Sequence, residues 1–222
     1  LLGVGGAQIF RAESTGPLKE GRLTPRISDT AKAFFNIYFA ISVLCAICYH
    51  MAGMDWDDAI MHTFTTVSLG GFSSHDAGFG YWSTRAVDYV CVVFLLIGGI
   101  NFSMHFLVWK KLSPMLYFKD VESCAWLLTA LVLTLLSTFL LVSFETYVNV
   151  GDAFYYSVTN VIFVISTSGF ANTNYGDWPL VVQLLALFGS SFATCAGSTG
   201  GGIKMIRAIA LVKQGGLEFK KI

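Results

Sequence analysis

The sequence has 222 residues, of which 55% are hydrophobic and only 13% are charged, and its mean hydropathy is +0.64. An average soluble domain carries about 25% charged residues, so this composition excludes an ordinary soluble domain. The formal net charge is zero and gives no indication of a nucleic-acid partner. The composition therefore predicts a protein whose main surroundings are the lipid bilayer.

Four apolar segments, each almost free of charge, are long enough for the roughly 20 residues that cross a hydrocarbon core. They are residues 33–54, 89–109, 125–144 and 179–203. We therefore expect at least four membrane-spanning helices.

Basic residues lie before the first span, between the second and third spans, and at the end of the fourth. The positive-inside rule then places both termini and the middle loop in the cytoplasm, in a multi-pass topology. The two outward loops, 55–82 and 145–178, are rich in aspartate. Such acidic loops could concentrate cations at a mouth, or they could carry ordinary solvated charge.

The chain contains an internal repeat. In each outward loop an apolar helical segment is followed by a Gly-Phe pair, and Gly71 and Gly169 lie 98 positions apart. The start of the chain, 5–11, resembles 201–207 at twice this offset. A fixed period of this kind predicts tandem structural units.

The repeat predicts an all-α membrane protein built of helix–pore-loop–helix units around a central ion pore. Its expected divisions are the tail of a preceding repeat with a cytoplasmic linker at 1–29, one pore-loop repeat at 30–111 and another at 112–222.

The outward loops are hydrophobic enough to re-enter the membrane as half helices. Backbone that is not helical at membrane depth is tolerated only where protein surrounds it or it lines water. Rings of backbone carbonyls can replace the hydration shell of a cation, and glycine permits the angles that such a strand needs. A turn or a packing glycine is the better explanation of one such loop, but two matching copies favour an ion filter. Its candidate residues are Leu69, Gly70, Gly71, Thr167, Ser168 and Gly169, and we expect Phe72 and Phe170 to anchor the two strands.

The paired loops, the Thr-Ser-Gly-Phe-Ala-Asn-Thr run at 167–173 and the Gly-Ser-Thr-Gly-Gly-Gly-Ile-Lys run at 197–204 resemble the TrkH, KtrB and plant HKT superfamily of cation transporters. The similarity covers essentially the whole chain and is strongest to the TrkH branch. It implies four repeats around one pore, of which this chain resembles the third and fourth. It also implies that Gly71 and Gly169 are filter glycines and that backbone carbonyls of the filter bind potassium. Leu69 stands where the next repeat has Thr167, so the selectivity for potassium over sodium stays open.

The same resemblance implies potassium uptake across the bacterial inner membrane by a homodimer. The implied partners are the remaining repeats of the same protein and a cytosolic nucleotide-binding regulator resembling TrkA. The sequence leaves open the regulator's nucleotide and any coupling to protons or sodium. It predicts no cofactor other than the transported ion.

The second span is interrupted by glycine and polar residues between positions 98 and 103. Close helix packing through small residues is one explanation. The resemblance implies the other, an intramembrane loop below the filter that acts as a gate.

The fourth span has a similar break at 197–202, followed by two basic residues. One of them is implied to obstruct the pore, although both could simply mark the cytoplasmic interface. The gate candidates are Gly98, Gly99, Asn101, Ser103, Lys204 and Arg207.

Two other classes of protein compete with the pore. A sodium- or proton-coupled symporter with alternating access also uses broken helices, but its breaks fall within spans and not in loops between them. A membrane enzyme is not predicted, because the four histidines share no metal-ligand spacing and no nucleophile set is evident.

Overall fold

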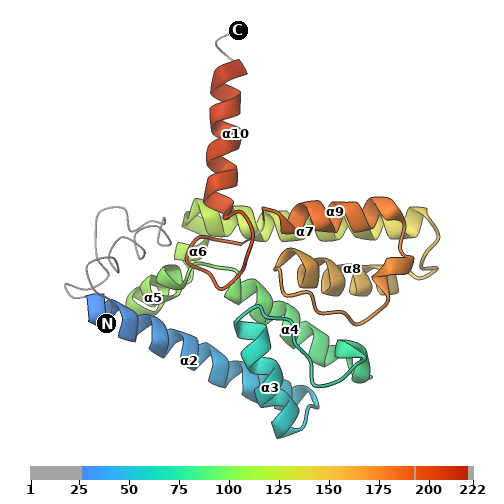
Figure 1. Ribbon diagram of the computed structural model, residues 1–222, viewed down its shortest axis with the longest axis horizontal. Helices are drawn as coiled ribbons and strands as arrows, with labels where there is room; N and C mark the ends of the chain where they lie inside the picture. The colour runs from blue at the N-terminus through green and yellow to red at the C-terminus, as the bar shows by residue number, and fades with distance from the viewer. Residues whose placement is uncertain (1–26, 193, 220–222) are drawn as a thin grey trace.

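The computed structural model describes residues 27–192 and 194–219, and all regular structure in this part of the chain is helical. The first unit contains α2 (Ile27–Ala52), α3 (Trp56–Val67), η1 (Gly78–Tyr81), α4 (Arg85–Gly98) and α5 (Phe102–Lys111). The second contains α6 (Met115–Lys119), α7 (Val121–Ser143), α8 (Val150–Ile165), η2 (Tyr175–Asp177), α9 (Leu180–Ser190) and α10 (Met205–Phe219). The predicted all-α fold is confirmed (Figure 1).

Each unit contains a long helix, α2 or α7, after which the chain turns back through a half-length helix and continues as a non-helical strand. The half helix α3 has 12 residues and α8 has 16, so they differ by about one helical turn. Both run beside the long helix that precedes them, because α3 packs on α2 and α8 packs on α7. The half helices therefore bring both Gly-Phe strands to the region where the two units meet (Figure 1).

Two continuous helices, Ala31–Ala52 and Val121–Ser143, are long and apolar enough to cross a membrane. The pair α4 and α5 forms a third candidate span that bends by 93° at its break. The interruption predicted near position 98 is therefore present as a sharp change of direction.

The fourth span at 179–203 is interrupted as predicted, but the non-helical segment begins before the expected break at 197–202. Helix α9 has 11 residues and ends at Ser190, and the chain stays non-helical until α10 begins at Met205. Gly197 and Gly202 adopt φ values of 69° and 76°, which an α-helix cannot contain. Beyond this break α10 extends away from the other helices (Figure 1).

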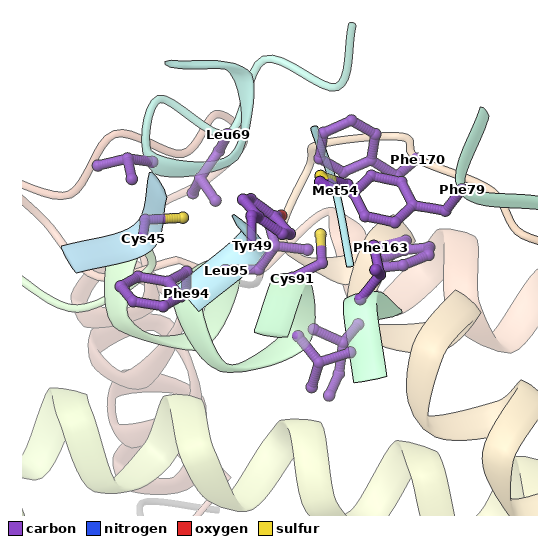
Figure 2. Close-up of a cluster of buried hydrophobic side chains, with 14 of the residues drawn as sticks. Cys45, Tyr49, Met54, Leu69, Phe79, Cys91, Phe94, Leu95, Phe163 and Phe170 are labelled. Carbon is purple, nitrogen blue, oxygen red and sulfur yellow. The ribbon is translucent and has the colours of Figure 1, made fainter. Parts of the chain in front are cut away.

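The main core joins the two units through aromatic side chains. Phe79, from the segment after the first strand, is fully buried and lies 5.4 Å from Phe163 and 4.7 Å from Phe170 between ring centroids. Figure 2 shows these rings beside residues of α2 and α4. Phe170 thus anchors its strand as predicted. Phe72 does not, because its side chain is 76% exposed and belongs to none of the buried clusters among the described residues.

A second core cluster fixes α7 against the end of α4. The fully buried Trp126 donates from Nε1 to the carbonyl of Leu96 at 3.1 Å. A Cβ at Gly99 would lie 2.8 Å from this indole ring, so the absence of a side chain at that position permits the contact.

The aromatic contact between the units should dominate the stability of this interface. Replacing Phe79 with alanine removes a fully buried ring and should lower the free energy of unfolding by about 3–5 kcal/mol. Phe139→Ala on α7 is the control, because that ring is 66% exposed and its loss should cost far less. Thermal unfolding in detergent measures both, and equal midpoints for the two variants would contradict this assignment of the core.

Candidate ion filter and gate

Both strands after the half helices have the same unusual backbone. Leu69 and Thr167 adopt φ values of 56° and 63°, and Gly71 and Gly169 adopt 72° and 78°. A left-handed conformation costs an L-residue roughly 1–2 kcal/mol, and it is rarest for a β-branched residue such as threonine. Strain stored at matching positions of two loops indicates a functional constraint on the backbone.

Each strand is hydrogen-bonded to the end of its own half helix. The amide of Gly70 donates to the carbonyl of Thr65 at 2.7 Å, and the amide of Gly169 donates to that of Phe163 at 2.9 Å. The hydroxyl of Ser168 also donates to Phe163, at 2.9 Å. The C-terminal, negative ends of both helix dipoles therefore lie directly beside the candidate filter strands.

The two strands also approach each other closely. A Cβ built at Gly71 would lie 1.7 Å from the carbonyl oxygen of Ser168, whereas one at Gly169 would meet nothing within 4 Å. Gly71 is therefore required by its φ value and by this contact, and Gly169 only by its φ value. The six predicted filter residues are brought together in one place.

The first gate candidate is the break between α4 and α5. Gly98, Gly99, Asn101 and Ser103 all lie there, and all four are buried. Asn101 caps α5, because its side-chain oxygen accepts from the amide of Ser103 at 2.8 Å. This break is a defined structure and not a gap in the helix.

The break after α9 is hydrogen-bonded to the break after α4. The amide of Cys195 donates to the carbonyl of Gly99 at 2.9 Å, and the amide of Thr199 donates to that of Gly98 at 3.4 Å. In the other direction, the amide of Phe102 donates to the carbonyl of Gly197 at 3.1 Å. Backbone groups that two broken helices leave unpaired thus satisfy one another.

The same segment reaches both filter strands. The hydroxyl of Thr199 donates to the carbonyl of Val67, the last residue of α3, at 2.9 Å. The amide of Gly201 donates to the hydroxyl of Thr167 at 2.9 Å. Filter strands and helix breaks therefore form one connected site.

Glu122 on α7 also belongs to this site, although it is not among the residues predicted from the sequence. Its side chain is 3% exposed, and Oε1 accepts from the amide of Ala196 at 2.7 Å and from that of Ile206 at 3.0 Å. One carboxylate oxygen thus holds the second break and the first turn of α10. The available sequence signal was an acidic residue at the edge of a predicted span.

The two basic gate candidates have different surroundings. Lys204 is half-buried, and its ammonium donates to the carbonyl of Gly200 within the second break. Arg207 is exposed on the first turn of α10, and among the described residues its side chain makes no hydrogen bond to the backbone of 98–103. Of the two, Lys204 is the one held at the break.

Two of the outward aspartates are paired. Asp58 accepts from Ser74 at 2.7 Å and contacts His75 at 3.0 Å, and Asp152 accepts from Arg85 at 2.6 Å. Burial would raise the pKa of Asp58, but the hydrogen bonds from His75 and Ser74 outweigh it and lower the pKa. These two carboxylates therefore have local structural partners in addition to any attraction for cations.

Three features define a membrane protein of the pore-loop class. They are half helices between long apolar helices, left-handed strands at the ends of the half helices, and paired helix breaks. The family model described as "TrkH: Cation transport protein" matches residues 1–221, and the chain belongs to this family of multi-pass membrane proteins.

Relatives support the same assignment. The "Trk system potassium uptake protein TrkH" of Vibrio parahaemolyticus is 42% identical over the whole chain, which covers 46% of that relative. The protein of that description from Escherichia coli K12 is 38% identical, with 46% of it covered. The crystal structure of the potassium transporter TrkH from Vibrio parahaemolyticus matches with a TM-score of 0.86 and 41% identity, over 92% of this chain and 44% of that one. This chain thus spans about half the length of these relatives. The family is one of cation transport proteins, in agreement with the prediction that the chain is not an enzyme.

The contacts of Glu122 predict that it stabilises the start of α10. Glu122→Ala should lower the free energy of unfolding by about 2–4 kcal/mol, because two amides lose a charged acceptor. It should also increase proteolysis near residue 200. Glu122→Gln keeps an acceptor and should have a smaller effect, and Glu145→Ala removes an exposed carboxylate as the control. Thermal unfolding and limited proteolysis test this, and identical behaviour of Glu122→Ala and Glu145→Ala would rule it out.

Proposed function

We propose that this chain supplies two filter loops and the gate of a pore for potassium uptake across a bacterial inner membrane. The observation that carries the proposal is the matched left-handed backbone at Leu69 and Gly71 and at Thr167 and Gly169, in strands that meet at the ends of two half helices. A backbone forced into this shape presents carbonyls that can replace the hydration shell of a cation. The potassium-uptake relatives support potassium as that cation.

The proposal includes partners outside the chain. Because the chain covers 46% of its relatives, we assign further pore loops of the same protein to the rest of the filter. The expected divisions at 1–29, 30–111 and 112–222 belong to this proposal. So do the cytoplasmic termini, a homodimeric assembly and a cytosolic nucleotide-binding regulator resembling TrkA.

In this mechanism potassium loses water at the outward strands and crosses below them through the site of the paired breaks. The membrane potential can drive the ion inward, since it contributes about 2.3 kcal/mol per charge per 100 mV. The pore is closed while the breaks hold each other, and it opens when their hydrogen bonds separate. A basic side chain below the filter adds electrostatic repulsion in surroundings of low dielectric constant.

An alternating-access symporter coupled to sodium or protons is the second candidate. The pairing of two broken helices favours it, because such breaks also build the substrate sites of secondary transporters. Uptake that follows the membrane potential alone supports the pore, and uptake that needs a proton or sodium gradient supports the symporter.

The filter assignment predicts different outcomes for the two glycines. In the complete protein, Gly169→Ala should fold, because its Cβ meets open space, and should reduce the flux ratio of potassium to sodium. Gly71→Ala should reduce the same ratio and also the amount of folded protein, because its Cβ would overlap the carbonyl of Ser168. Gly215→Ala is the control, since that position has open space and lies on α10. The potassium and sodium fluxes are measured in proteoliposomes. An unchanged flux ratio for well-folded Gly169→Ala would reject the assignment of these strands as an ion filter.

The gate assignment predicts that Lys204→Ala raises potassium flux more than Arg207→Ala does. The lysine lies at the break and its removal takes away both a positive charge and the contact with Gly200. Lys213→Ala, on the exposed part of α10, is the control for loss of charge. If neither of the first two variants conducts faster than the control, the basic pair is only a topology signal.

A further inference from the structure

A buried histidine ties the first filter strand to its half helix. His62 on α3 is fully buried, and its Nδ1 lies 2.9 Å from the carbonyl of Asp58. Its Nε2 lies 3.0 Å from the hydroxyl of Ser73, two residues after Gly71. Because a carbonyl only accepts, Nδ1 carries the proton of a neutral ring and Nε2 accepts from the serine.

A buried asparagine makes the corresponding tie to the second strand. Asn160 on α8 is 1% exposed, and its Nδ2 donates to Oδ1 of Asn172 at 2.7 Å. The backbone amide of Asn172 donates back to Oδ1 of Asn160 at 3.4 Å. Asn172 lies three residues after Gly169, so this pair holds the strand just beyond the filter.

These two side-chain contacts, called ties below, start from the same position in the repeat. His62 lies nine residues before Gly71, and Asn160 lies nine residues before Gly169. The side chains differ in type but both reach from the half helix to the strand that follows it. What the two repeats share is therefore the tie itself and not a particular residue.

The second strand is also held from the first unit. Oδ2 of Asp88, on α4, accepts from Nδ2 of Asn172 at 2.9 Å and from the hydroxyl of Tyr155. Asp88 is 2% exposed, and a buried carboxylate inside a membrane protein normally has a specific task. Asn172 thus receives contacts from α8 and from α4 at once.

We propose that His62 and Asn160 are positioning residues that set the place of the filter strands and thereby the selectivity of the pore. The inference rests on the proposed function of these strands as an ion filter. A non-helical strand has no hydrogen-bond ladder of its own, and the cation preference of a carbonyl ring depends on where its oxygens lie. A tie from a rigid helix to the strand therefore limits how far the oxygens can shift to accommodate a different ion.

The test measures the flux ratio of potassium to sodium for the complete protein in proteoliposomes. His62→Ala and Asn160→Ala should each reduce this ratio roughly two- to tenfold, the equivalent of one lost hydrogen bond. Ser73→Ala should have the same effect as His62→Ala, and the double variant should add little, because both remove one interaction. His62→Gln should restore most of the ratio, since its amide oxygen reaches about as far as Nε2 and accepts from Ser73 in the same way.

Thr63→Ala and Ser157→Ala are matched controls from the same two half helices. Both hydroxyls are buried, that of Thr63 faces Cys45 on α2, and that of Ser157 has no hydrogen-bond partner among the described residues, so their removal leaves the strands untouched. A merely structural role for the ties would lower protein stability and leave the flux ratio at the control value. Where His62→Ala does not reach the membrane, Ser73→Ala removes the same hydrogen bond and decides, with His62→Gln as the variant that retains it.

Gly169→Ala separates failure of this inference from failure of the proposed function. If Gly169→Ala lowers the ratio while His62→Ala, Ser73→Ala and Asn160→Ala match their controls, the ties are not positioning residues and the inference is overturned. If Gly169→Ala also leaves the ratio unchanged, the strands are not the filter and both proposals are overturned. A reduced ratio in the tie variants together with Gly169→Ala supports both.

Discussion

The fold depends on the requirement that non-helical backbone at membrane depth finds its hydrogen bonds within the protein. Hydrocarbon has no groups to offer, and each unsatisfied amide or carbonyl costs several kcal/mol there. The chain meets this requirement by placing two broken helices against each other, so that Gly98 and Gly99 accept from Thr199 and Cys195. Glu122 supplies a further acceptor for two amides of the second break. Neither break could be stable in this form without the other.

This pairing connects the gate candidates to the filter candidates mechanically. Thr199 bonds to the last carbonyl of α3, and Gly201 bonds to the side chain of Thr167 in the second filter strand. A displacement of α10 that moved this segment would therefore also shift the end of α3 and the second filter strand. The arrangement gives a movement of α10 a short route to both candidate filter strands.

The sequence predicted features that depend on local pattern, and it failed where distant contacts decide. The repeat, the Gly-Phe strands after the half helices and the break near Gly98 follow from glycine placement and apolar periodicity, and the structure contains all three. The end of α9 at Ser190 did not follow, because the predicted break was placed at the later glycines, 197–202, and only tertiary hydrogen bonds show where the helix stops. The roles of Phe72 and Phe170 looked equivalent, yet only Phe170 finds a partner in Phe79, which comes from the other unit. Glu122 could not be assigned either, because its partners lie about 80 residues away.

The difference between Leu69 and Thr167 has a structural explanation at the level of strain. Both residues adopt a left-handed backbone that glycine would adopt at lower cost, so each must gain something from its side chain. Leu69 gains burial, because it is 5% exposed and packs in the core cluster beside Gly98. Thr167 gains the hydrogen bond from Gly201, which satisfies an amide of the second break. Each strained position is thus compensated by a contact with one of the paired breaks. Because Leu69 has no hydroxyl, the backbone carbonyls are the polar groups that both strands can present in the same way.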